Sequence, residues 1–381
     1  MNQRLDRQMS SVGLVKVDDI AKAYDFGPSH PLRPERVLLT YDHIADLGLD
    51  TRPGVRSIPS RSATDEEILR VHDDDFVRAV RGIDAGEVAE SGGFEFGLGT
   101  GDNPIFSGMH RASAAVCGAS ITAGEAVARG DVTRSFNPAG GLHHARRREA
   151  SGFCIYNDPA AAIAAILELQ PSWRVVYLDV DVHHGDGVQW IFYRDPRVMT
   201  VSLHQSGHYL YPGTGFEDEV GEGEGLGTSV NVPLLPLTNE EDYLWALEEV
   251  FPKVCSVFRP DVVVTQLGAD THHGDPLAGL DLTMTAYPRM ARIIREAVEV
   301  HTAGRWVATG GGGYQAETVV PKVWTIHFAE MVGAPETIPP EWLEDRSPGE
   351  VSPSSRRAVQ DSVSDVLERC LPRLEALATQ R

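Results

Sequence analysis

The sequence predicts an α/β fold built on a parallel sheet, and two observations favour it. Four short stretches are rich in valine and leucine and apolar on both faces, as in parallel sheets that helices cover on both sides. Helical candidates lie between these stretches, and strands that alternate with helices indicate such a fold. Ligands of open parallel sheets bind beyond the carboxyl ends of the strands. The polar residues at those ends are therefore the expected site.

The expected strands each run into glycine, aspartate or histidine. They cover Val175–Val182, Val198–Leu203, Val262–Leu267 and Trp306–Thr309. The helices between and around them are expected over Pro159–Leu169, which begins with proline, Asn239–Val250, which has acid in its first turn, and Thr285–His301.

The remaining segments indicate loops and a tail around one domain that spans residues 1–381. Glu219–Gly227 is rich in glycine and acid and is expected as a surface loop. The proline-rich stretch Gly333–Ser355 is expected to wrap the surface before a last helix over Val359–Cys370. Pro372 should end or kink that helix because proline lacks the backbone N–H.

The charge balance disfavours nucleic acid as a partner. The chain has 34 basic and 55 acidic residues and a formal net charge of −21. A protein of this charge repels polyanions, so DNA, RNA and anionic membrane surfaces are disfavoured as partners. Cationic partners such as lysine-rich tails or polyamines become somewhat more favourable.

Cysteine usage and hydropathy predict a cytoplasmic protein. The four cysteines are scattered, with no pair at metal-clip spacing, and free thiols in a reducing compartment are expected: Cys117, Cys154, Cys255 and Cys370. The first twenty residues lack a basic region followed by an apolar run, and no stretch of about 18 apolar residues occurs. No export and no membrane span are predicted.

The strongest chemical signal is the motif LDVDVHHGDG at Leu178–Gly187. Side chains at i and i+2 of a strand point the same way, so Asp181 and His183 should project together. Carboxylate oxygen and imidazole nitrogen suit Zn²⁺ or Fe²⁺, and a catalytic metal site needs three protein ligands and an open position. The third ligand should come from another strand end, where QLGADTHHGDP offers Asp270.

Other residues near Asp270 could also serve as ligands, namely His272, His273 and Asp275. His272, two residues further on, could reach a second metal ion. Loop histidines are more often surface residues, however, so we expect His272 to lie outside the site.

Two further motifs could complete a hydrolytic site. GGLHH at Gly140–His144 offers paired histidines, and a histidine can take up and return a proton at neutral pH. GGGGY at Gly310–Tyr314 lets the backbone approach a ligand closely and ends in a hydroxyl that could stabilise an oxyanion. Histidine pairs are common, and a plain strand-to-helix turn with a packed tyrosine is an equally good interpretation of GGGGY. A phosphate loop is excluded because no GK[ST] follows.

Taken together, the motifs resemble those of the zinc-dependent histone deacetylases, and within that superfamily those of the bacterial acetoin-utilisation deacetylases. The resemblance covers roughly Pro28 to Val332 and leaves the tail out. Its motifs are PAGGLHHA (Pro138–Ala145), GFCIYND (Gly152–Asp158), LDVDVHHGDG, SLH…YPGTG (Ser202–Gly215), QLGADTHHGDPL (Gln266–Leu277) and GGGGY. The fold it implies is the arginase/deacetylase-like open sheet of eight parallel strands with helices on both faces.

The resemblance also implies roles for individual residues. The metal ligands are Asp181, His183 and Asp270. The catalytic residues are the paired His143 and His144, the carboxylates Asp179 and Asp186 that orient them, and Tyr314, which binds the substrate carbonyl. The acyl-lysine tunnel and its rim are formed by Gly152, Phe153, Tyr211, Leu277 and Asp102. Tyr211 departs from the usual phenylalanine and places a hydroxyl at the tunnel edge.

Bound ions are implied as well. One Zn²⁺, or Fe²⁺, per chain is expected, with K⁺ held largely by backbone carbonyls. The first potassium site matches Asp179, Asp181, His183, Ser202 and Leu203, and the second, weaker match involves Phe192, Asp195, Val198 and Thr228. Arginases bind two metals through the motif D-x-H-x-D. In this chain the position of the last aspartate is occupied by Gly185. A mononuclear site is therefore predicted.

The activity implied is hydrolysis of acetyl, or other short acyl, groups from lysine side chains of proteins. One alternative is deacetylation of small amines such as acetylpolyamines. Leu277 argues against it, because polyamine deacetylases have glutamate at that position, and Asp102 matches a residue that grips a substrate backbone. A catalytically silent binder of acyl-lysine would lack one of the catalytic residues, and all are present. An arginase-type ureohydrolase is disfavoured by Gly185.

Overall fold

The computed structural model describes residues 11–17, 19–347, 349–350 and 352–378. Within these residues eight strands form one sheet in the order β2-β1-β3-β8-β7-β4-β5-β6, and all neighbouring strands are parallel. The predicted fold class is thus confirmed. The strands are β1 (Val12–Lys16), β2 (Val55–Pro59), β3 (Arg134–Asn137), β4 (Val175–Asp179), β5 (Val198–Gln205), β6 (Ser229–Leu234), β7 (Val262–Gln266) and β8 (Trp306–Thr309).

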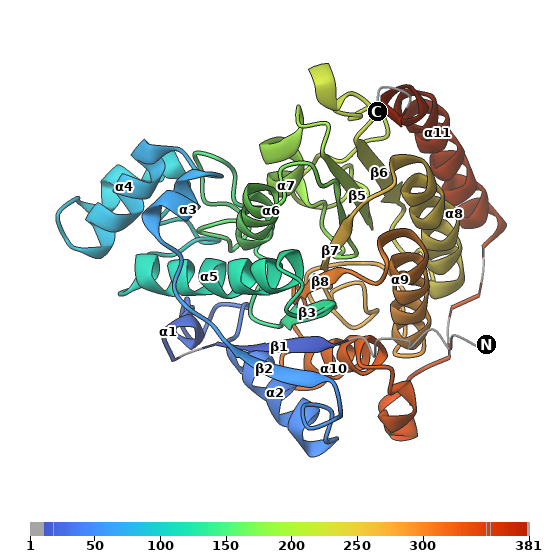
Figure 1. Ribbon diagram of the computed structural model, residues 1–381, viewed down its shortest axis with the longest axis horizontal. Helices are drawn as coiled ribbons and strands as arrows, with labels where there is room; N and C mark the ends of the chain where they lie inside the picture. The colour runs from blue at the N-terminus through green and yellow to red at the C-terminus, as the bar shows by residue number, and fades with distance from the viewer. Residues whose placement is uncertain (1–10, 18, 348, 351, 379–381) are drawn as a thin grey trace, which may run out of the picture.

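Helices cover both faces of the sheet, as Figure 1 shows, with α5 and α6 on one side and α8 to α11 on the other. The α-helices are α1 (Asp19–Lys22), α2 (Glu35–Asp46), α3 (Asp65–Leu69), α4 (Asp74–Asp84), α5 (Met109–Ala128), α6 (Asp158–Leu169), α7 (Asp186–Phe192), α8 (Glu240–Phe258), α9 (Ala286–Thr302), α10 (Val320–Met331) and α11 (Pro353–Ala378). Short 3₁₀ turns lie at Glu90–Phe96, Gly223–Gly225, Pro335–Thr337 and Pro340–Trp342.

Strand β4 shows why these strands are apolar throughout. Successive side chains of a strand point to opposite faces. Val176 and Leu178 join the core under α8 and α9, whereas Val175 and Tyr177 join the core under α5 and α6. Both faces of the strand are buried, so the alternation of apolar and polar residues that a half-exposed strand would show is missing.

Several boundaries differ from the sequence-based expectation. Strand β4 ends at Asp179, three residues before the predicted end, so Asp181 and His183 lie in the loop that follows rather than in the strand. Helix α8 continues through Pro252 to Phe258.

Pro372, which was expected to end or kink the last helix, does not end it, because α11 extends from Pro353 to Ala378. Val366, Cys370 and Leu374 on this helix are buried, and α11 packs against α8 and β6. We attribute the continuation past the proline to this packing, because tertiary contacts supply most helix stability in proteins and outweigh one missing hydrogen bond.

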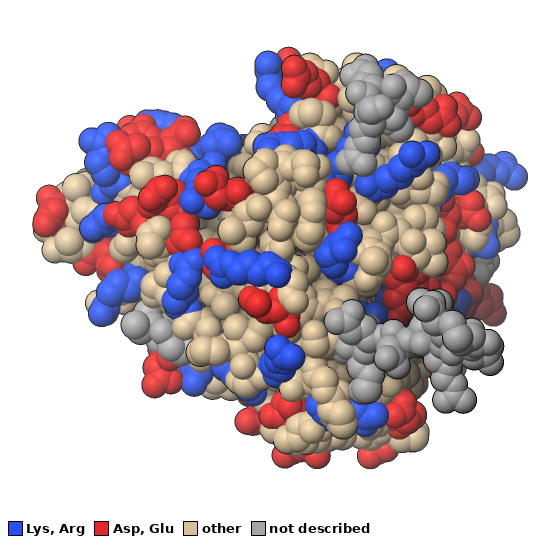
Figure 2. Space-filling model, in the orientation of Figure 1, with Lys and Arg blue, Asp and Glu red and all other residues tan. Residues whose placement is uncertain are grey.

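The four cysteines are free and buried, in agreement with the expected thiols. Among the described residues, none of the helices combines the length and apolar character that crossing a bilayer requires. Figure 2 shows acidic and basic side chains interspersed over the face it presents. Charged groups there are therefore mixed in sign rather than gathered into one field.

Candidate active site

The predicted site residues follow four neighbouring strands in the middle of the sheet. Strands β3, β8, β7 and β4 are adjacent, and their chain continues into the GGLHH, GGGGY, QLGAD and DVDVHH segments respectively. The carboxyl ends of parallel strands meet at one edge of a sheet. The fold therefore brings together motifs that are as much as 170 residues apart in the chain, from Gly140 to Gly310.

Asp181, His183 and Asp270 form a buried cluster at this edge. His183 Nδ1 lies 3.0 Å from Asp181 Oδ1 and 3.2 Å from Asp270 Oδ2. One ligand atom from each residue lies within 4.8 Å of the others, and all three residues are buried. The structure thus places the three predicted ligands around one point.

The donor set of this cluster fits a divalent metal ion. Burial, and next the charge of Asp181, raise the pKa of Asp270 to about 8, whereas His143 and His183 overcome burial and hold the pKa of Asp181 well below its usual range. Two carboxylates that repel each other in a buried space are stabilised by a cation between them. Two oxygens and one imidazole nitrogen match the ligands of a catalytic zinc or iron site with an open position.

Neighbouring groups hold both carboxylates in place. The Gln266 side-chain amide donates to Asp181 Oδ2 at 2.6 Å, and the Gly312 N–H donates to the same oxygen at 2.8 Å. The Val182 N–H donates to Asp270 Oδ1 at 2.9 Å. The backbone donor to Asp270 uses the oxygen that does not face His183, whereas Asp181 Oδ1, which faces His183 Nδ1, also accepts the His183 N–H at 2.9 Å. Such outer contacts orient metal ligands.

The glycine run after β8 lies against these carboxylates. A Cβ atom on Gly312 would lie 2.1 Å from Asp270 Oδ2 and 2.7 Å from Asp181 Oδ2. A Cβ on Gly311 would lie 2.5 Å from the Gln266 side chain. The glycines thus let the backbone approach the carboxylates of Asp181 and Asp270. The sequence analysis predicted a close approach of the backbone here but did not say to which group.

His143 and His144 form a pair beside the cluster. Their Nε2 atoms lie 3.0 Å apart. His143 Nδ1 lies 2.7 Å from Asp179 Oδ2, and His144 Nδ1 lies 2.7 Å from Asp186 Oδ1. Because a carboxylate accepts, each Nδ1 carries a proton, and the two Nε2 atoms are left to face each other and the site.

The two histidines differ in protonation although their contacts look alike. Burial disfavours the imidazolium of His143, but the charges of Asp179 and Asp181 outweigh burial and raise the pKa of His143 to about 9. Burial, and then the neighbouring His143, lower the pKa of His144 to about 4. At neutral pH His143 is therefore charged and His144 is neutral, which gives one proton donor and one proton acceptor side by side.

Tyr314 completes a narrow pocket of about 20 Å³ over the histidines. The pocket is lined by Leu32, Gly141, Leu142, His143, His144, Gly152, Phe153, Cys154, Asp181, Gly311, Gly312 and Tyr314. The Tyr314 and Phe153 rings meet edge to face with centroids 5.7 Å apart. Tyr211 lies close by, since its ring centroid is 5.1 Å from that of His144, and its hydroxyl hydrogen-bonds Ser151 Oγ.

Gly152 and Phe153 are held in an unusual backbone conformation. Both have positive φ, at 50° and 68° respectively. A Cβ on Gly152 would lie 2.4 Å from His144 Cδ2, so a side chain here would displace the histidine. The Phe153 carbonyl accepts a hydrogen bond from the Tyr24 hydroxyl at 2.9 Å, a long-range contact that fixes the aromatic wall.

The two predicted rim residues lie farther out. Asp102 is exposed, and its carbonyl oxygen lies 3.3 Å from His30 Nε2, whose ring meets Phe153 at 4.5 Å. Leu277 is 37% exposed, and its N–H donates to Asp275 Oδ1 at 2.9 Å. Both residues are thus linked to the pocket walls through one intermediate residue.

The residues of the first predicted potassium site also gather near β4. Ser202 pairs with Asp179 across β4 and β5, and Ser202 Oγ lies 2.9 Å from His204 Nδ1. The Leu203 carbonyl accepts a hydrogen bond from the Tyr243 hydroxyl at 3.4 Å.

The residues of the second predicted potassium site lie around the loop between α7 and β5. Their carbonyls take part in local hydrogen bonds, as in Asp195 N–H to Phe192 O at 2.9 Å, Val198 N–H to Asp195 O at 3.2 Å and Thr200 N–H to Thr228 O at 2.9 Å. Both potassium sites stay predictions.

The sequence interpretation missed several residues that support the site. Arg36 is buried and donates to the carbonyls of Gly311 and Gly313 at 2.9 Å each. Asp158 accepts from the N–H of Gly141 and of Leu142 and so fixes the loop before the histidine pair. Asp158 belongs to the GFCIYND motif, whereas no pattern in the sequence points to Arg36.

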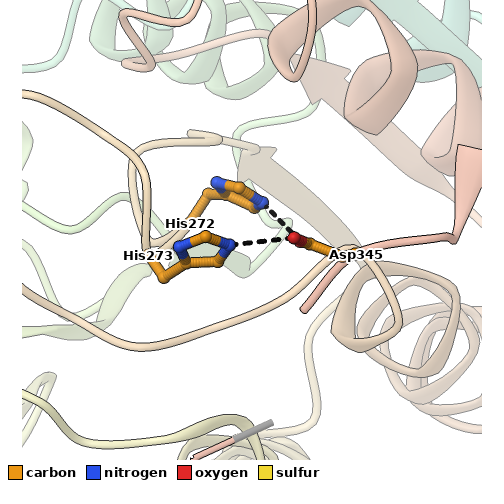
Figure 3. Close-up of side chains that lie close together, drawn as sticks. All are labelled: His272, His273 and Asp345. Atoms are coloured by element: carbon orange, nitrogen blue, oxygen red, sulfur yellow. Dashed lines mark hydrogen bonds and ion pairs between the residues drawn. The ribbon is translucent and has the colours of Figure 1, made fainter. Parts of the chain in front are cut away.

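His272 was expected at the surface, and this expectation was wrong. The residue is only 5% exposed. It stays outside the ligand cluster and instead contacts Asp345, together with His273 (Figure 3). The tail folds back over the loop that follows Asp270, which a local view of the sequence could not show.

Comparison with known proteins assigns the chain to a family. A model of the histone deacetylase domain matches residues 30–331. The acetoin utilization protein AcuC of Bacillus subtilis (strain 168) is 42% identical over 324 residues, which cover 84% of this chain and 83% of that protein. AcuC of Staphylococcus aureus (strain MRSA252) is 34% identical over 342 residues, covering 89% and 87%. AcuC of Staphylococcus xylosus is 32% identical over 347 residues, covering 90% and 89%.

The chain belongs to the histone deacetylase family. Its match to the AcuC proteins covers most of both chains and bears out the resemblance found in the motifs. Members of this family are hydrolases that are in general metal-dependent, and the cluster of Asp181, His183 and Asp270 is a candidate for the metal.

The position of Gly312 leads to a prediction about metal binding. Gly312→Ala should lower the metal content of the purified protein, because a methyl group would push the Asp270 and Asp181 carboxylates apart. Elemental analysis after dialysis against a weak chelator measures this. Gly101→Ala is the matched control, since a Cβ there meets no atom within 4 Å. Wild-type metal content in Gly312→Ala would contradict the assigned geometry.

Proposed function

We propose that this protein is a zinc-dependent deacetylase that hydrolyses acetyl groups from lysine side chains of proteins. The observation that carries the proposal is the pair of imidazoles of His143 and His144, each held by a carboxylate, beside a buried three-ligand cluster. A hydrolase that splits an amide needs a base for water and an acid for the leaving amine. This pair offers both at neutral pH.

Asp181, His183 and Asp270 would hold the ion, which when bound supplies Lewis acidity toward the amide carbonyl and lowers the pKa of a water. Neutral His144 has an acceptor at Nε2 and takes the proton of the attacking water. Charged His143 donates its Nε2 proton to the leaving lysine nitrogen, whose C–N bond breaks. The products are lysine and acetate.

Asp186 and Asp179 keep the two imidazoles oriented through this cycle, because each accepts from Nδ1 of one histidine. Tyr314 lines the same pocket as the two histidines. Its hydroxyl would donate to the carbonyl oxygen as that oxygen becomes negative, which is the role of an oxyanion-hole donor. Phe153 and Tyr211 would flank the lysine methylene chain.

One ion per chain is part of the proposal. A Cβ on Gly185 would lie 2.3 Å from Asp179 Oδ2, so the position that carries a second-metal ligand in arginases has no room for a side chain unless its neighbours shift. Potassium at the backbone sites near β4 would lower the basicity of the groups that Asp179 contacts. Elemental analysis of the purified protein checks the number of divalent ions and the presence of potassium.

The proposed function is tested with a panel of acetyl-lysine peptides and acetylpolyamines against the purified protein, with zinc, iron and potassium measured on the same sample. We expect peptides to be better substrates by kcat/KM, because Leu277 puts no carboxylate at the rim position that is glutamate in polyamine deacetylases, and Asp102 matches a residue that grips a substrate backbone. Higher kcat/KM for acetylpolyamines would favour the small-amine alternative. Binding of the peptides without turnover would indicate a silent binder.

Tyr314→Phe should separate catalysis from binding. The substitution removes one oxygen, so kcat should fall by about 10²–10³-fold, as for other single oxyanion-hole donors, with little change in KM. Steady-state kinetics on an acetyl-lysine peptide and a direct binding titration measure the two effects. Loss of peptide binding together with kcat would mean that Tyr314 shapes the pocket instead.

The two histidine pKa values predict the pH profile of kcat/KM. Activity should fall below about pH 4 as His144 gains a proton and above about pH 9 as His143 loses one. Asp179→Asn removes the main charge that raises the pKa of His143, so the alkaline limb should move to lower pH. Asp186→Asn is the comparison: Asp186 contacts the other histidine and raises the pKa of His143 less than Asp179 does, so the alkaline limb should move less. An unmoved limb in Asp179→Asn would refute His143 as the acid.

A further inference from the structure

A carboxylate from the tail sits between two histidines of the loop that follows Asp270. Asp345 Oδ2 lies 2.9 Å from His272 Nε2, and Asp345 Oδ1 lies 3.0 Å from His273 Nε2, as Figure 3 shows. Asp345 lies beyond residues 30–331, which match the family domain. The side chain of Asp345 is 15% exposed. The contact therefore joins the tail to the catalytic domain at an exposed residue whose side chain is mostly covered.

These three residues have the chemistry of a metal site, but their hydrogen bonds favour a different role. The Gly274 N–H donates to His272 Nδ1 at 3.2 Å. Nδ1 thus holds a lone pair, and the proton of the neutral ring is on Nε2, where it is donated to Asp345. An ion at Nε2 would need that proton on Nδ1 and would break the Gly274 bond.

Asp345 collects donors from three places in the chain. Besides both imidazoles, its Oδ2 accepts the Met284 N–H at 3.1 Å, and its Oδ1 accepts the N–H of Arg346 at 2.7 Å. Although burial opposes ionisation, the hydrogen bonds led by that of His273 lower the pKa of Asp345 to about 2. A fixed anion thus ties the loop at His272 to the segment that leads into α9.

Hydrogen bonds connect the loop His272–Asp275 to Tyr314, which lines the pocket. The Asp275 N–H donates to the His272 carbonyl at 2.9 Å, which forms a tight turn. Asp275 Oδ2 then accepts the Tyr314 N–H at 2.8 Å, and Asp275 Oδ1 accepts the Leu277 N–H. On the other side of the turn, the Gln315 side-chain amide donates to the Gly274 carbonyl. Asp275 and Gly274 therefore attach the loop to Tyr314 and its neighbour.

We propose that Asp345 is a positioning residue that acts through the loop His272–Asp275 to hold Tyr314 in place over the pocket. The inference rests on the proposed function only for the role of Tyr314. The contacts by which Asp345 holds the loop His272–Asp275, called the clamp below, affect the order of the loop whatever reaction the protein catalyses. The tail would thus be a working part of the deacetylase rather than an appendage. Removal of the carboxylate should loosen the loop and leave the metal cluster and the histidine pair intact.

Asp345→Ala tests the clamp. Hydrogen–deuterium exchange should become faster in peptides covering residues 270–277 and 310–316, because the loop loses its shared acceptor. This measurement needs no activity, so it remains decisive if the protein proves not to be a deacetylase. Glu344→Gln is the matched control, since it removes the exposed neighbouring carboxylate. Unchanged exchange at residues 310–316 in Asp345→Ala would overturn the proposal.

Kinetics test the link to Tyr314. Asp345→Ala should lower kcat on the order of tenfold, as small misplacements of catalytic groups do, with KM changed less than about twofold. In a Tyr314→Phe background the same change should lower kcat less than about twofold, because groups that act as a unit are not additive. An equal fall in both backgrounds would show that Asp345 acts elsewhere and refute the link.

Two further measurements keep the outcome clear. His273→Ala removes one donor at a side chain that is 23% exposed, and it should show the same changes more weakly if Asp345→Ala does not fold. Zinc per chain should be equal in wild type and Asp345→Ala. A drop by one ion per chain in Asp345→Ala would show that the three residues bind metal, and this would overturn the clamp.

Discussion

The site depends on the burial of two acidic side chains next to each other. Asp181 and Asp270 lie beyond two neighbouring strands, and both contact the same imidazole nitrogen. Carboxylates in a space of low dielectric repel each other strongly. Backbone amides, the Gln266 amide, the imidazoles of His143 and His183 and a metal ion can stabilise them. The run of glycines after β8 follows from the same constraint, since only a backbone without Cβ can bring the Gly312 N–H to Asp181.

The neighbouring charges also give the two histidines different pKa values. His143 contacts Asp179 and lies near Asp181, so its charged form is stabilised. Burial, and then the charged His143, favour the neutral form of His144, although Asp186 contacts its other nitrogen. Two identical side chains, each with a carboxylate at Nδ1, thus become an acid and a base. The difference arises because a second carboxylate, that of Asp181, lies near His143. The HH motif by itself does not reveal this difference.

The sequence predicted the sheet and the central cluster because strong local signals encode them. Apolar runs located β4, β5, β7 and β8, and the motifs at their ends named the three ligands that the structure brings together. Contacts between distant segments were not predictable in this way. Examples are Arg36 on the glycine run, the buried His272 and the continuation of α11 past Pro372, because each depends on what packs against it. The potassium sites, the metal identity and a cytoplasmic location stay predictions.

The loop after β7 has to meet two demands at once. Asp270 must stay fixed relative to Asp181 and His183, the other members of the ligand cluster. Asp275 and Leu277 must stay fixed relative to the pocket and its rim. Hydrogen bonds within the loop can set its shape but not its position on the domain. Position requires an anchor outside the loop, and a carboxylate that accepts from His272, His273 and Met284 together provides one. An anchor in the tail rather than in the sheet leaves the strand ends free for catalysis, and it makes the order of the pocket depend on a segment outside the matched domain.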